Sequence, residues 1–207
     1  MKQFSISMAI VDYIPVLFFT VAAIMLQRDL YSKMSKGAFA LFAAGTIDIM
    51  FAGFSKATYK LLYATGICDL QALNTLFFPV QSIGFLLAGI GILAMIVHKQ
   101  TENAALAVAP PFVKGTFFFV GLMCVGLFMI YLVLCVLAIK LKKPILIIVF
   151  IVSLLCTLFM GYLSTKDFNL SYMNWIAQSV NIVAQGLLLY GAFALRKAGL
   201  ASLILNK

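Results

Sequence analysis

Long apolar runs constrain the fold of this chain more than any other feature. Six stretches are each long enough to cross the hydrocarbon core of a bilayer as a helix, which takes about 20 residues. They lie at about residues 8–27, 37–57, 73–97, 115–139, 144–163 and 172–195. Because no backbone polar group can stay unpaired in lipid, we expect an all-α, polytopic membrane bundle of six transmembrane helices.

The composition agrees with a membrane protein. Of the 207 residues, 64% are hydrophobic and only 10% are charged, whereas about 25% of the residues in a soluble domain are charged. The first run has no small-residue cleavage site after a short apolar core, so we expect it to be kept as a helix. The apolar runs fill the chain, and we therefore expect a single transmembrane domain over residues 1–207.

Pro110 and Pro111 mark the longest break between runs, close to the middle of the chain. The expected parts are half one at about 8–97, a loop at 98–114 and half two at about 115–195. A weak similarity between IMFAGFSK at 49–56 and TLFMGYLSTK at 157–166 supports two related halves. Three spans per half would give the halves opposite orientations, so we predict a 3+3 inverted repeat, as in many secondary transporters.

The net charge of +9 does not indicate nucleic-acid binding, because most lysines and arginines lie at the ends of apolar runs. There they meet lipid headgroups. The cationic turn KLKK at 140–143 favours a multi-pass protein of the cell membrane with both termini in the cytoplasm. The four cysteines and the single histidine have no metal-ligand spacing, so we predict no metal site and no cofactor.

Four amide side chains follow one face of the last run, in the stretch NWIAQSVNIVAQG at 174–186. They are Asn174, Gln178, Asn181 and Gln185. Spacings of 4, 3 and 4 residues keep them inside an arc of roughly 60° on a helix. Asn74 and Gln81 in the third run are also amides, seven residues apart. Amides need hydrogen-bond partners in lipid, so these six either join helices or line a path for a polar solute.

Two carboxylates inside apolar runs are candidates for proton or cation coupling. Asp48 lies in the middle of the second run, where a carboxylate is costly and usually faces a cavity. The alternative is a protonated Asp48 that donates to a helix carbonyl. Asp12 lies near the start of the first run and could instead cap the helix or complement its dipole.

Prolines, lysines and glycines in the runs have simpler interpretations. Pro15 and Pro79 should each free a backbone carbonyl for a ligand or a neighbouring helix. Lys56 and Lys60, at the end of the second run, should extend to the membrane interface. Close helix contact is expected at Gly84, Gly89, Gly91, Gly121, Gly126, Gly186 and Gly191.

Three functions stay open from the sequence. The first is a secondary transporter or solute-binding membrane subunit, in which the six amides hold a small polar or amphiphilic solute. Amides rather than charges would suit a neutral or zwitterionic solute. The second is an intramembrane enzyme that acts on a lipid or peptide through an Asp12/Asp48 dyad. The third is a non-transporting scaffold or sensor. Expected partners are membrane lipid, the solute, and a homodimer mate or an energising complex.

Overall fold

The computed structural model describes residues 5–97, 116–163 and 171–204, and all regular structure within these ranges is helical. The elements are α1 (Ile6–Val11), α2 (Tyr13–Leu30), η1 (Tyr31–Lys33), α3 (Lys36–Thr65), α4 (Gln71–Thr75), α5 (Phe77–Val97), α6 (Thr116–Lys140), α7 (Ile145–Leu163), α8 (Ser171–Lys197) and η2 (Leu200–Ser202). Six helical segments are long and apolar enough to cross a membrane, with α1–α2 and α4–α5 each counting as one. The expectation of six helices long enough to cross a membrane is confirmed, and each expected stretch overlaps one of these segments, which we call spans.

Two of the spans are interrupted just before a proline. Asp12 separates α1 from α2, and Leu76 separates α4 from α5. Pro15 and Pro79 follow these breaks by three residues. A proline has no N–H, so the carbonyl four residues earlier loses its helical donor and the helix can break there. At Pro15 this freed carbonyl belongs to Val11.

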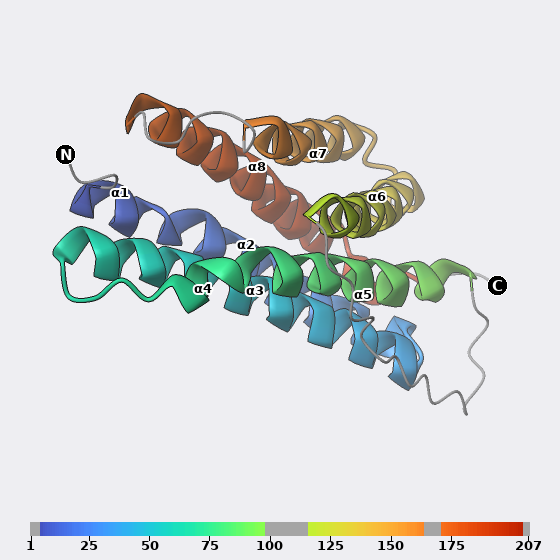
Figure 1. Ribbon diagram of the computed structural model, residues 1–207. Helices are drawn as coiled ribbons and strands as arrows, with labels where there is room; N and C mark the ends of the chain where they lie inside the picture. Colours follow the sequence, from blue (N-terminus) through green and yellow to red (C-terminus); the bar gives the residue numbers. More distant parts are fainter. Residues whose placement is uncertain (1–4, 98–115, 164–170, 205–207) are drawn as a thin grey trace.

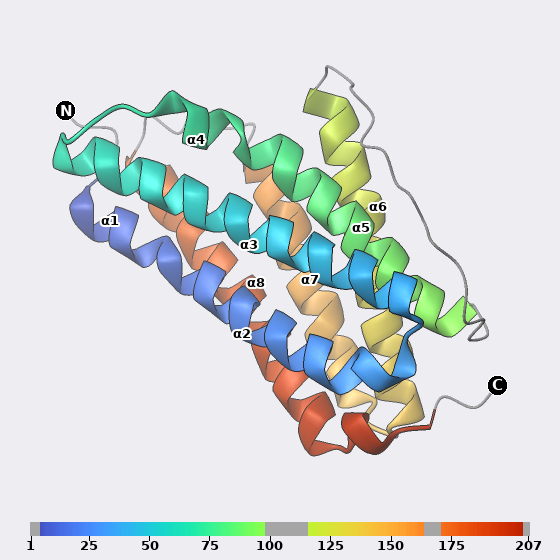
Figure 2. The same ribbon diagram turned by 90° about the horizontal axis from the view of Figure 1, so that it is seen from below.

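The six spans form a closed ring within the described residues. Each of α2, α3, α5, α6, α7 and α8 packs against the next in chain order, and α8 packs back against α2 (Figures 1 and 2). The main apolar core includes Phe42 of α3, Phe85 of α5, Leu134 of α6, Phe150 of α7 and Leu195 of α8. A ring of this kind brings one face of every span towards a common interior.

Glycines bring α5 close to its two neighbours. A Cβ atom added at Gly91 would lie 2.5 Å from the backbone nitrogen of Phe42 on α3. One added at Gly89 would lie 2.7 Å from the carbonyl oxygen of Gly126 on α6. Gly126 in turn lies directly against the backbone of Phe85. Such close approach allows extensive van der Waals contact, which is a principal source of helix association in lipid.

The expected close helix contacts are confirmed at most of these glycines, but not at every one. Gly84, Gly89, Gly91, Gly126 and Gly191 leave no free space for a side chain, whereas Gly186 makes only an ordinary contact, at 3.6 Å from Phe18. The expectation is wrong for Gly121, where a Cβ atom would meet no described atom within 4 Å. Gly45 makes a further close contact that the sequence does not predict, because it lies against the backbone of α5 at Ala88.

Contacts at both ends show that α8 runs parallel to α2. Near their starts, Gln178 of α8 donates to the carbonyl of Val11. Near their ends, Arg196 Nε lies 4.0 Å from Asp29 Oδ2. The directions alternate from α2 through α3 to α5, and again from α6 through α7 to α8 (Figure 2). It follows that α5 and α6 point the same way, and that Val97 and Thr116 lie at opposite ends of the bundle.

These directions differ from the predicted inverted repeat. The two three-helix halves run in the same direction, and the start of α1 lies at the opposite end of the bundle from η2 (Figure 1). The opposite positions of α1 and η2 also differ from the expectation that both termini lie on one side of the membrane. The prediction assumed that the loop at 98–114 joins helix ends on the same side, and this loop lies outside the described residues.

Positive charge gathers at one end of the bundle, which we call the cationic end. It holds eight of the ten lysines and arginines whose positions are described: Arg28, Lys33, Lys36, Lys140, Lys142, Lys143, Arg196 and Lys197. Lys33 Nζ also donates to the carbonyls of Ala201 and Leu203, at 2.9 and 2.7 Å. The C-terminal η2 is thereby held against the end of α2.

The glycine contacts give a first prediction. Gly126→Ala should destabilise the protein by about 1–3 kcal/mol, because its new methyl group would overlap the backbone of α5. Gly121→Ala on the same helix is the matched control and should leave stability unchanged or slightly higher. Thermal unfolding of the two purified variants in the same detergent measures the difference. Equal melting temperatures would contradict the α5–α6 contact described above.

Candidate functional site

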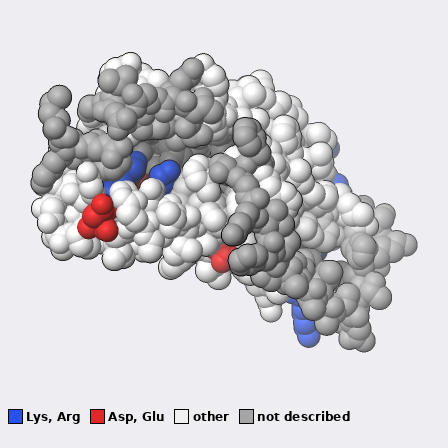
Figure 3. Space-filling view, in the orientation of Figure 1, with Lys and Arg blue, Asp and Glu red and all other residues white. Residues whose placement is uncertain are grey.

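A cavity of about 320 Å³ lies between the helices of the ring, in the half of the bundle farther from the cationic end, and it is partly open to the outside. All six spans contribute to its wall, with residues of α2, α3, α5, α6, α7 and α8 lining it. This volume is at the lower end of the range of about 300–1,000 Å³ for small-molecule sites. Figure 3 shows blue Lys or Arg side chains recessed in a hollow, at the end of the bundle that holds α1 and α4.

Most of the predicted amides meet at this cavity. Gln81 of α5 lines it, together with the complete α8 stripe: Asn174, Gln178, Asn181 and Gln185. Asn74 does not line it, because it lies exposed on the short helix α4. The break at Leu76 separates Asn74 from Gln81, so their seven-residue spacing does not keep them on one helical face.

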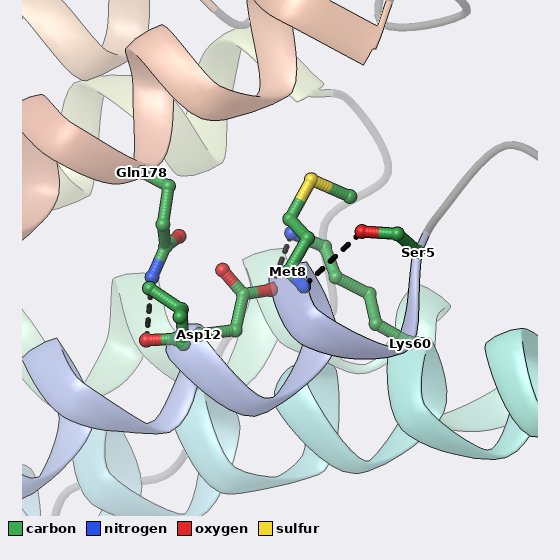
Figure 4. Close-up of polar contacts among 6 residues, drawn as sticks. Ser5, Met8, Asp12, Lys60 and Gln178 are labelled. Atoms are coloured by element: carbon green, nitrogen blue, oxygen red, sulfur yellow. Dashed lines mark hydrogen bonds and ion pairs between the residues drawn. The ribbon is translucent and has the colours of Figure 1, made fainter.

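One amide of the stripe joins two helices. Gln178 Nε2 donates to the carbonyl oxygen of Val11 at 2.9 Å (Figure 4). This is the carbonyl that Pro15 deprives of its helical donor, so the side chain from α8 replaces the missing backbone N–H. The expectation that Pro15 frees a carbonyl for a neighbour is confirmed. For Gln178, the helix-joining interpretation of the stripe applies.

Gln185 behaves differently from Gln178. Its Oε1 atom is buried and has no hydrogen-bond partner among the residues that the structure describes. An unpaired buried acceptor costs about 1–3 kcal/mol, and the large majority of such groups in proteins are paired. Gln185 lines the cavity, so an O–H or N–H group of a molecule bound there could satisfy this oxygen.

Charged groups lie at the same cavity. Lys60 of α3 forms an ion pair with Asp12, which is only 9% exposed (Figure 4). Lys56 Nζ lies 3.8 Å from the ring centroid of Phe77 and 5.7 Å from that of Phe78. Both lysines line the cavity wall, which differs from the expectation that they extend to the membrane interface. The carboxylate of Asp12 explains the position of Lys60.

Asp48 lies outside the cavity lining, although it was a candidate for coupling. It is half-buried on α3 at the seam with α5, where a Cβ atom added at Gly84 would lie 2.9 Å from its own Cβ. Asp12 is paired with Lys60, which is twelve residues further along α3 than Asp48, or about 18 Å of helix. The structure therefore does not bring Asp12 and Asp48 together as a dyad.

No cluster of three or more His, Cys, Asp or Glu side chains forms within the described part of the chain. The chain matches no protein-family model, no curated protein and no solved structure. The functional interpretation therefore rests on the cavity and on the side chains in its wall.

The contact between α8 and the broken first span gives a second prediction. Gln178→Leu should destabilise the protein by about 0.6–2 kcal/mol, because the Val11 carbonyl loses its donor. In a Pro15→Ala background the new backbone N–H can serve that carbonyl, so the same substitution should cost less. A double-mutant cycle by thermal unfolding measures this coupling. Fully additive effects would contradict the replacement of a backbone donor by Gln178.

Proposed function

We propose that this protein binds a small amphiphilic solute inside its membrane bundle, as a transporter or as a solute-binding membrane subunit. The observation that carries the proposal is the buried Gln185 Oε1, which has no partner within the described residues and lies at a cavity of about 320 Å³. Intramembrane polar groups of this kind commonly mark solute or ion pathways.

The two alternatives have less support. In a scaffold the stripe amides would join helices, as Gln178 does, but Gln185 Oε1 contacts no donor in the described residues. An enzyme with a carboxylate dyad would need its two aspartates side by side. Asp12 is instead paired with Lys60, and Asp48 lies outside the cavity lining.

The charge distribution supports an orientation. Lysines and arginines accumulate on the cytoplasmic side of membrane proteins, so the cationic end would face the cytoplasm. The start of α1 and the cavity half would then face the other side of the membrane. In this orientation the solute reaches its site from outside the cytoplasm, which fits uptake or sensing of an external compound.

A ligand screen tests the proposed site. In a thermal-shift screen against vitamins, amino acids, nucleosides and lipids, we expect a compound that raises the melting temperature of the parent protein. A ligand at 100 times its Kd adds about 2.7 kcal/mol to folding stability. Gln185→Leu, which removes the unpaired acceptor, should lose most of this gain.

The control for the screen is an amide outside the cavity lining. Gln27 Nε2 donates to Thr46 Oγ1 at 2.6 Å, so Gln27→Leu should lower the starting melting temperature but keep the shift with ligand. A stabilising compound that acts equally on the parent and on Gln185→Leu would place its site elsewhere and contradict the proposal.

The orientation can be tested with a natural cysteine. Cys68 is exposed in the connection between α3 and α4, at the end away from the cationic end. A membrane-impermeant maleimide should label it in intact cells, and Cys68→Ser should abolish that labelling. Lys143→Cys in the Cys68→Ser background should react only after the cells are permeabilised. The reverse pattern would contradict the orientation.

A further inference from the structure

We infer that the solute carries an anionic group, a carboxylate or a phosphate, which binds Lys56 at the polar part of the cavity. This inference rests on the proposed function and names the substrate class of the same site. It also revises the expectation of a neutral or zwitterionic solute, which was drawn from the amides alone.

The charges on the described residues of the cavity wall do not balance. Lys56 and Lys60 contribute two positive charges and Asp12 one negative charge. Asp12 is committed to Lys60, with which it forms an ion pair. The described residues form two ion pairs, Lys60 with Asp12 and Arg196 with Asp29. No carboxylate of the described residues lies within 4.0 Å of Lys56 Nζ. Among the residues that the structure describes, Lys56 therefore has no carboxylate in direct contact.

The surroundings of Lys56 make this imbalance costly. Its ammonium group lies over the ring of Phe77, with Phe78 as a second aromatic neighbour. A cation–π contact recovers part of the hydration that a lysine loses on burial, but a paired anion recovers more. Lys60, one helical turn away on α3, adds a second positive charge at the same wall. An anionic group in the cavity would be attracted by both lysines.

The remainder of the wall suits an apolar body. Phe19, Ile49, Phe85 and Met123 line the cavity from four different helices. Gln185 lies deeper in the bundle than Gln178, on the side of this apolar wall. Its neighbour Gly186 is level with Phe18 of α2, whereas Gln178 is level with Val11 near the start of the first span. The inferred ligand thus has an anionic group near Lys56, an apolar body, and an O–H or N–H donor for Gln185 Oε1.

The test compares four single-chain probes that share one apolar tail. Octanoate and octyl phosphate carry an anionic group, octanol is neutral and octylamine is cationic. Binding of each is measured by thermal shift and calorimetry on the full chain in phosphatidylcholine nanodiscs. We expect the two anionic probes to bind the parent more tightly than octanol, and octylamine to bind least.

The variants separate the charge of Lys56 from its volume. Lys56→Met keeps the length of the side chain and removes the charge, so the affinity for the anionic probes should fall about 10- to 100-fold. Lys56→Arg should keep affinity within several-fold of the parent. Lys143→Met, at the cationic end, removes an exposed lysine and should change nothing.

Two further arms identify the source of the anion. Nanodiscs with added phosphatidic acid should weaken the binding of octyl phosphate by competition if the natural ligand is a lipid headgroup. Unchanged binding of octyl phosphate in those nanodiscs indicates a soluble anion. Either result supports an anionic ligand at Lys56.

Failure of the inference can be told apart from failure of the proposed function. If octanol binds the parent as tightly as octanoate, and Gln185→Leu weakens the binding of octanol, whose hydroxyl can donate to Gln185 Oε1, the cavity binds a solute but the anionic group is wrong. Equal affinity of octanoate for the parent and for Lys56→Met would likewise overturn the inference. If none of the four probes binds the parent, the anionic site is contradicted and the proposed solute site loses its support.

Discussion

In helices apolar enough to cross a bilayer, every backbone polar group has to find its partner within the protein, and this requirement accounts for both the fold and the site. It explains why the spans are helical, and why the carbonyl that Pro15 frees is served by Gln178 from another helix. That one hydrogen bond places the amide stripe of α8 against the first span. The remaining stripe amides then face the interior of the ring, where the cavity lies.

Much of the fold follows from the sequence because hydrophobic length is a strong signal. The six spans are predictable from it, and so are close contacts at Gly89 and Gly126. The periodicity of the α8 amides also predicts that Asn174 to Gln185 share one face, and they line one cavity. Within an unbroken helix, spacing alone places side chains.

Other features depend on tertiary structure that spacing does not encode. The directions of α5 and α6 depend on how the chain passes between them, and hydrophobic length says nothing about that path. Asn74 does not lie at the predicted site, because the helix breaks at Leu76. The position of Lys60 depends on Asp12, 48 residues earlier in the chain, so an interfacial location was the reasonable expectation from sequence.

The central claim is that the interior of this bundle holds a solute at Gln185. Native mass spectrometry of the protein released from its own membrane tests this most directly. The account predicts that one small molecule stays bound to the parent chain and is absent from the Gln185→Leu variant prepared in the same way. A parent chain that shows only its bare mass, or an adduct equally present on the variant, would contradict the account.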